Sequence, residues 1–195
     1  GGAPDDPARD GLKSELSAVE AGLAPALKQL DEAHALLQRV VSIQETVERR
    51  NLCGSAFKRR AMIEAARRGV GQPRSAEETD ALTKMQEQYA SAERLAREQR
   101  SPDLFYPALN RMAAELILRG GTAPFAFEEA DVMGVRNVLQ DKTSRDPDFW
   151  SVIGISELRL YAAVAARRLA DEQPAILQEY RDLYERVSAA NMWDS

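Results

Sequence analysis

The stretch DFWSVIGISELRLY, residues 148–161, decides the fold class. Within it, Trp150, Ile153 and Gly154 are spaced so that all three fall on one face of a helix. The same arrangement of a bulky residue followed by a small one recurs as Arg50, Cys53, Gly54 and Phe57, and as Tyr106, Leu109, Asn110 and Ala113. A glycine costs roughly 1 kcal/mol inside a helix. Gly54 and Gly154 therefore indicate points where a neighbouring helix approaches closely.

Outward from this stretch, the chain is a succession of helical patterns separated by Pro and Gly. Apolar residues recur near every 3.6 positions, and no alternating strand pattern is present. Gly22 and Pro25 predict a break near the start. Ser42 with Glu45, and Ser75 with Glu78, have the spacing of capping boxes. About eight helices are predicted, near residues 12–23, 27–41, 42–68, 75–96, 102–120, 128–140, 149–169 and 174–187.

Composition narrows the function classes. The 195 residues are 44% hydrophobic and 29% charged, which is enough for one folded domain. No apolar run approaches the roughly 18 residues of a membrane span, so we expect a cytoplasmic protein without a membrane partner. Residues 1–10 are expected to be a flexible start with a cloning scar at Gly1-Gly2, and residues 11–195 a single all-α domain.

The three bulky-to-small stretches resemble the W-x2-L-G-x2-Y pattern in the first helix of tetratricopeptide (TPR) units. The resemblance implies antiparallel helix pairs stacked as a short TPR-like array, in which the small residue lets the next helix approach. Gly54 to Asn110 spans 56 positions and Asn110 to Gly154 spans 44, whereas TPR units recur about every 34. The array is therefore predicted to be irregular. The alternative is an irregular helical bundle with the two glycines as packing points.

Two segments carry a further resemblance. FYPALN at 105–110 and the stretch from Asp148 to Tyr161 are similar to the TPR-like carboxy-terminal regions of large bacterial multidomain proteins, some of which carry CHAT peptidase or other conflict-system effector modules. The resemblance covers about residues 48–195. It implies a non-catalytic adaptor or sensor segment that regulates an effector domain outside this sequence.

Charge is distributed unevenly. Residues 48–68 carry seven Arg and Lys against two Glu, a net of +5, inside a chain whose net charge is −5. Such a basic helix either forms salt bridges with acidic neighbours or provides a face for an anion. Nucleic acid is disfavoured as the anion, because the whole chain is acidic and its basic residues are not interleaved with aromatic ones.

The TPR pattern also assigns groove positions. With Gly54 as the small residue, the groove-lining positions are Asn51, Ser55, Lys58 and Arg59, which share a 100° sector of a helix. The same transfer from Asn110 and Gly154 gives Arg111 and Arg159. An amide beside several cations resembles the way TPR domains hold a peptide carboxylate. The predicted partner is a protein or peptide, acidic in character, or the chain's own effector domain.

Catalytic and metal motifs are weak. Asp31-Glu32-Ala33-His34 matches a helicase tetrapeptide, but no phosphate loop accompanies it. His34 is the only His and Cys53 the only Cys, so we expect no metal, no cofactor and no disulfide. Two alternatives stay open: a helical enzyme, or an enzyme's regulatory part, that uses clustered carboxylates, and a structural oligomerisation segment.

Overall fold

The computed structural model describes residues 7–68, 71–120 and 123–186, and within these ranges it contains helices and no strand. The helices are α1 (Pro7–Ile43), α2 (Val47–Arg68), α3 (Ala76–Glu98), α4 (Phe105–Arg119), α5 (Glu129–Arg145), α6 (Phe149–Ala165) and α7 (Leu169–Arg186). The predicted all-α fold is confirmed, with seven helices in the described residues instead of about eight.

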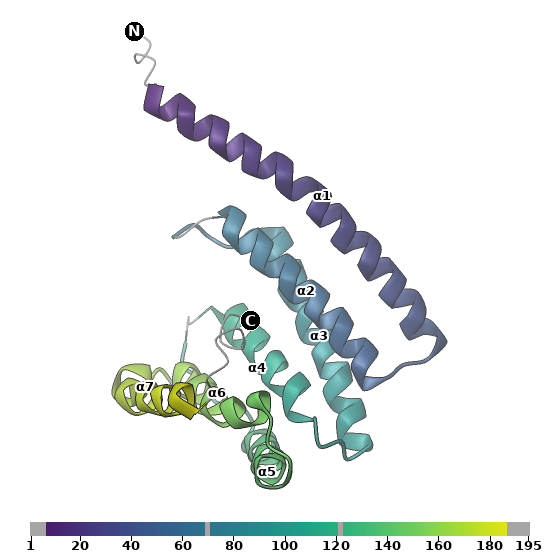
Figure 1. The fold of residues 1–195 in the computed structure, drawn as a ribbon, viewed down its shortest axis with the longest axis vertical. Helices are drawn as coiled ribbons and strands as arrows, with labels where there is room; N and C mark the ends of the chain where they lie inside the picture. Colours follow the sequence, from purple (N-terminus) through teal and green to yellow (C-terminus); the bar gives the residue numbers. More distant parts are fainter. Residues whose placement is uncertain (1–6, 69–70, 121–122, 187–195) are drawn as a thin grey trace.

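The helices form pairs that stack on one another. α2 packs on α3, and α6 packs on α7, while α4 contacts α3, α5 and α6. Figure 1 shows α1 lying along α2, followed by α3 and α4, with α5, α6 and α7 at the other end of the molecule. Each helix thus contacts mainly its neighbours in the stack, as in repeat arrays.

The break predicted at Gly22 and Pro25 is wrong, because α1 runs through both residues. Proline removes one hydrogen bond from a helix and crowds the preceding turn. A kink is the usual response, and the chain can continue as a helix beyond it when the other turns hold. α1 contacts α2, and five of its apolar residues are half-buried or buried: Leu23, Leu27, Leu30, Leu37 and Val41.

Capping explains where α2 and α3 begin. Ser42 does not start a helix, since it lies in the last turn of α1, where its hydroxyl donates to the Arg39 carbonyl. Instead, the Thr46 hydroxyl accepts a hydrogen bond from the Arg49 amide at 3.2 Å. Ser75 is the predicted cap of α3, and its hydroxyl accepts from the Glu78 amide at 3.0 Å.

Two helices that were predicted to begin at a proline begin elsewhere. α4 begins at Phe105, three residues after Pro102. Pro174 lies inside α7, which begins at Leu169. Predictions that involve Gly69, Gly121, Thr122, Val187 and residues 1–6 fall outside the described residues.

Two clusters of buried side chains form the core. One joins α2, α3 and α4 around Met85 and Tyr89, and the other joins α4, α5 and α6 around Met112 and Leu139. The half-buried Tyr106 of α4 packs against both clusters. The helix pairs therefore share a continuous core, with α4 in the middle.

Candidate functional site: a groove with cationic and aromatic walls

A groove of about 450 Å³ lies between α2, α4 and α6. Its lining residues come from the three helices that carry the bulky-to-small stretches. They are Ser55, Lys58, Arg59 and Met62 from α2; Phe105, Tyr106, Leu109 and Asn110 from α4; and Trp150, Glu157 and Tyr161 from α6.

Two exposed cations stand on the α2 wall. Lys58 donates to the side-chain oxygen of Asn110 across the groove, at a long 3.4 Å. Arg59 forms no hydrogen bond or ion pair with any described residue. On the same wall, the Ser55 hydroxyl shares a hydrogen bond of 3.0 Å with the Tyr89 hydroxyl, which connects α2 to α3.

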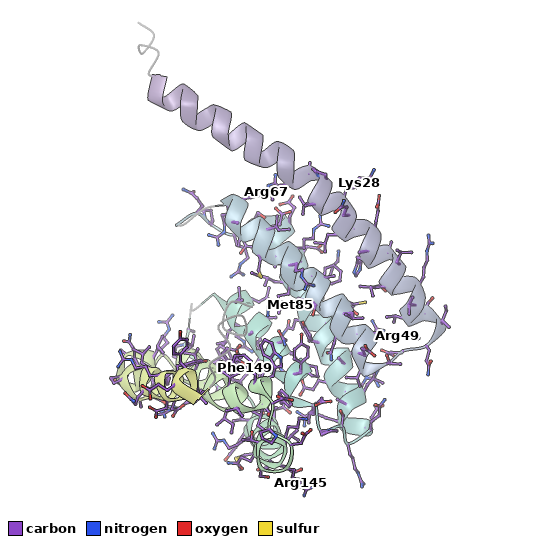
Figure 2. All side chains as sticks on the ribbon, in the orientation of Figure 1. Lys28, Arg49, Arg67, Met85, Arg145 and Phe149 are labelled. Atoms are coloured by element: carbon purple, nitrogen blue, oxygen red, sulfur yellow. The ribbon has the colours of Figure 1, made fainter. Side chains whose placement is uncertain are left out.

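The other cations of α2 already have partners. Arg49 donates to the carbonyls of Val40 and Gln44, and Arg50 pairs with Glu45. The remaining three ion pairs are Arg60 with Asp31, Arg67 with Glu64, and Arg68 with Glu78. Figure 2 marks Arg49 and Arg67 near the two ends of α2. Five cations of α2 therefore have internal partners, and Lys58 and Arg59 remain at the groove. That these two bind an anion stays a prediction.

Aromatic and apolar side chains supply much of the rest of the lining. Trp150 is 45% exposed and Met62 is 63% exposed, whereas Phe105 is buried. Exposed large apolar side chains beside charged ones are typical of binding surfaces. The groove can therefore hold both apolar and charged parts of a ligand.

Glu157 is the one carboxylate among the groove's lining residues. It is half-buried and forms no hydrogen bond or ion pair with a described residue. Burial raises the pKa of Glu157 above its ordinary value, and the charge of Lys58 offsets part of that rise. An ionised Glu157 thus lacks a close partner in the groove.

The structure divides the six residues that the TPR pattern assigned. Ser55, Lys58 and Arg59 line the groove together. Asn51 lies on the same face of α2, one turn before Ser55, and its side-chain oxygen is buried without a hydrogen-bond partner.

Arg111 and Arg159 lie outside the groove. At 100° per residue, Arg111 is about 170° around α4 from the middle of the groove-lining residues, and Arg159 is about 180° around α6. Arg111 instead pairs with Glu93 of α3 and with Asp131 of α5. Arg159 pairs with Glu172 and Glu179 of α7. Both arginines tie neighbouring helices together.

Sequence reasoning did not identify four of the groove-lining residues, which are Tyr106, Trp150, Glu157 and Tyr161. Tyr106 and Trp150 are the first residues of two of the bulky-to-small stretches, which were interpreted as helix-packing patterns and not as binding positions. Glu157 comes three residues after Gly154, in the place of the tyrosine of the TPR pattern. A carboxylate at that normally aromatic position was the available signal.

The carboxylates that do cluster are neutralised. Glu93, Glu115 and Asp131 all pair with Arg111. Burial lowers the pKa of Arg111, but hydrogen bonding to Glu93 and the three negative charges outweigh it, so the net pKa is raised. In the described residues no group of three or more His, Cys, Asp or Glu side chains has the arrangement of a metal site.

Two further surface features bear on partners. α1 exposes Leu36, Val40 and Ile43 at the spacing of one helix face, which keeps the oligomerisation segment open as a hypothesis. Among the described helices, none is long and apolar enough to cross a membrane.

Comparison with known proteins gives a match to a family. No curated protein and no solved structure matches the chain significantly. The sequence model of TPR-S, Tetratricopeptide Repeats-Sensor, matches residues 4–115, which is more than half of the chain and includes α1 to α3 and most of α4. The groove residues of α2 and α4 fall inside this match, and those of α6 follow it. The chain therefore belongs to the Tetratricopeptide Repeats-Sensor family.

Proposed function

We propose that this protein is a non-catalytic interaction or sensor module whose groove binds an acidic or carboxylate-ended segment of a partner. One observation carries the proposal: among the seven cations of α2, Lys58 and Arg59 alone are not engaged in an ion pair or in binding backbone carbonyls, and both line the groove. A carboxylate between them would gain charge-assisted hydrogen bonds. Membership of a family of TPR sensors supports the same reading.

The proposal extends to the context of the module. The acidic segment belongs to an effector domain that this module regulates, either in the same polypeptide or in a partner, and a CHAT-type peptidase of a bacterial conflict system is the effector that the sequence resemblance favours. Residues 11–195 act as one domain in the cytoplasm. Ser55, Lys58 and Arg59 contact the segment, with Asn51 extending the same face of α2.

Charge reversal of the groove tests the proposal. The probe is a library of six-residue peptides with Asp or Glu at two positions and a free carboxy terminus. Lys58→Glu together with Arg59→Glu should weaken binding by about 1 to 3 kcal/mol, measured by titration calorimetry on the best library member. Thermal stability should change little, because neither cation forms an ion pair with a described residue.

A matched control separates groove contacts from net charge. Lys28→Glu with Arg39→Glu makes the same change in net charge on exposed positions of α1, away from the groove. This variant should bind like the unmodified protein. Equal weakening in both variants, or unfolding of the groove variant with unchanged residual binding, would place the binding surface elsewhere.

A further inference from the structure

The position of Glu157 bears on which acidic segment fits. Glu157 projects from α6 into the groove whose α2 wall carries Lys58 and Arg59. The positive charge of Lys58 offsets part of the rise in the pKa of Glu157, and both side chains line the same groove. A ligand carrying only negative charge would gain from Lys58 and Arg59 but would be repelled by Glu157.

The surroundings of Glu157 suit a cation. Tyr161 lies one turn further along α6, and Trp150 lies two turns before it on the same face. Tyr106 lines the groove from α4, and the half-buried Tyr180 of α7 is near enough to interact with Glu157. Aromatic faces attract ammonium and guanidinium groups, and a carboxylate with no hydrogen bond adds a full opposite charge.

We propose that the groove binds a bipolar peptide segment, in which a basic side chain lies within one or two residues of a carboxylate. The carboxylate of the segment pairs with Lys58 and Arg59, and its ammonium or guanidinium group pairs with Glu157 between the rings of Trp150 and Tyr161. This inference rests on the proposed function and specifies its ligand. It follows from the juxtaposition, in one groove, of a carboxylate on α6 and two cations on α2, none of which forms an ion pair with a described residue.

Binding of a basic group would also stabilise the ionised form of Glu157. Partial burial without a partner destabilises the ionised form of a carboxylate. A basic group of the ligand would remove that penalty on binding, whereas Lys58 would be drawn to the ligand's carboxylate. The other charged side chains that line the groove, Lys58 and Arg59, belong to α2.

Three peptide libraries with randomised flanks test the inference. All are acetylated and amidated hexapeptides; one fixes adjacent Asp and Lys, one replaces the Lys by Leu, and one replaces the Asp by Asn. Retention on the immobilised protein is measured at neutral pH. The bipolar library should be retained about tenfold better than the acidic library. In Glu157→Gln this preference should vanish, while Glu87→Gln, an exposed carboxylate of α3 outside the groove, should keep it.

The outcomes separate this inference from the function on which it rests. If the acidic library is retained as well as the bipolar one, or if Glu157→Gln keeps the preference, the bipolar ligand is excluded and the acid-binding groove survives. If the unmodified protein retains the bipolar and the acidic library no better than the Lys58→Glu, Arg59→Glu variant does, both proposals fail. Circular dichroism of each variant confirms that the helices are intact.

Discussion

At the scale of single residues, two glycines set how closely the helices approach. A Cβ atom added at Gly54 would lie 2.8 Å from the ring of Tyr89, and one at Gly154 would lie 2.8 Å from a methyl group of Leu139. The spacing of the sequence predicted both as packing points, and these distances confirm it. It did not predict that Asn110, the third residue of the set, would use its amide for hydrogen bonds to Lys58 and Tyr106.

We expect Gly54→Ala to destabilise the protein by about 1 kcal/mol. Overpacking costs about 1 to 3 kcal/mol, and the better helix propensity of alanine returns about 1 kcal/mol. The Tyr89 ring has little freedom to move, because it is fully buried and its hydroxyl is bound to Ser55. Urea unfolding measures the change. Gly22→Ala is the control, because nothing lies within 4 Å of that position, and its stability should be unchanged or higher.

At the scale of helices, the direction in which a face points depends on packing that one sequence does not reveal. Three α2 positions that the TPR pattern assigned, Ser55, Lys58 and Arg59, line one groove. The same offsets applied to α4 and α6 selected the opposite faces. On those faces Arg111 pairs with the buried Glu93 of α3, and Arg159 pairs with Glu172 and Glu179 of α7. Such long-range ion pairs leave no local periodic signal.

Arg111→Leu should therefore cost on the order of 3 kcal/mol. Removing one partner of a buried ion pair leaves the other charge uncompensated. The side chain of Glu93 is 7% exposed and would keep only Arg97 as a partner. Arg145→Leu is the control, because Arg145 is 77% exposed and pairs only with Asp141 one turn before it. That change should stay within about 0.5 kcal/mol by urea unfolding. Similar losses for both variants would mean that Arg111 is not a tie between helices.

At the scale of the whole molecule, the helical class and the stacked pairs follow from the sequence, whereas the groove does not. Its walls come from α2, α4 and α6, which span residues 47 to 165, and its shape depends on how three pairs stack. α1 contacts α2 on the side away from the groove: Phe57 and Arg60, its partners in α2, lie about 170° around that helix from Ser55. Docking of α1 and binding in the groove are therefore expected to be separable.

Lowering the pH should loosen the packing of α1 on α2 and leave the groove helices α4 and α6 unchanged. Burial lowers the pKa of His34, as do the charges of Lys84 and Arg60, while Asp31 raises it in part. The neutral ring packs over Phe57 with centroids 4.1 Å apart. Because the folded pKa lies below the unfolded one, this contribution is present above the unfolded pKa of about 6.5 and is lost as the pH falls through the folded value.

Hydrogen exchange measures this loosening. Between about pH 7.5 and about pH 5, the amides of α1 should lose protection relative to their intrinsic rates, while those of α4 and α6 keep theirs. His34→Gln should flatten the response, since glutamine does not titrate in this range. Equal protection of α1 at both pH values would show that neutral His34 does not hold this helix against α2. Parallel loss in α1, α4 and α6 would show instead that the stack opens as one cooperative unit.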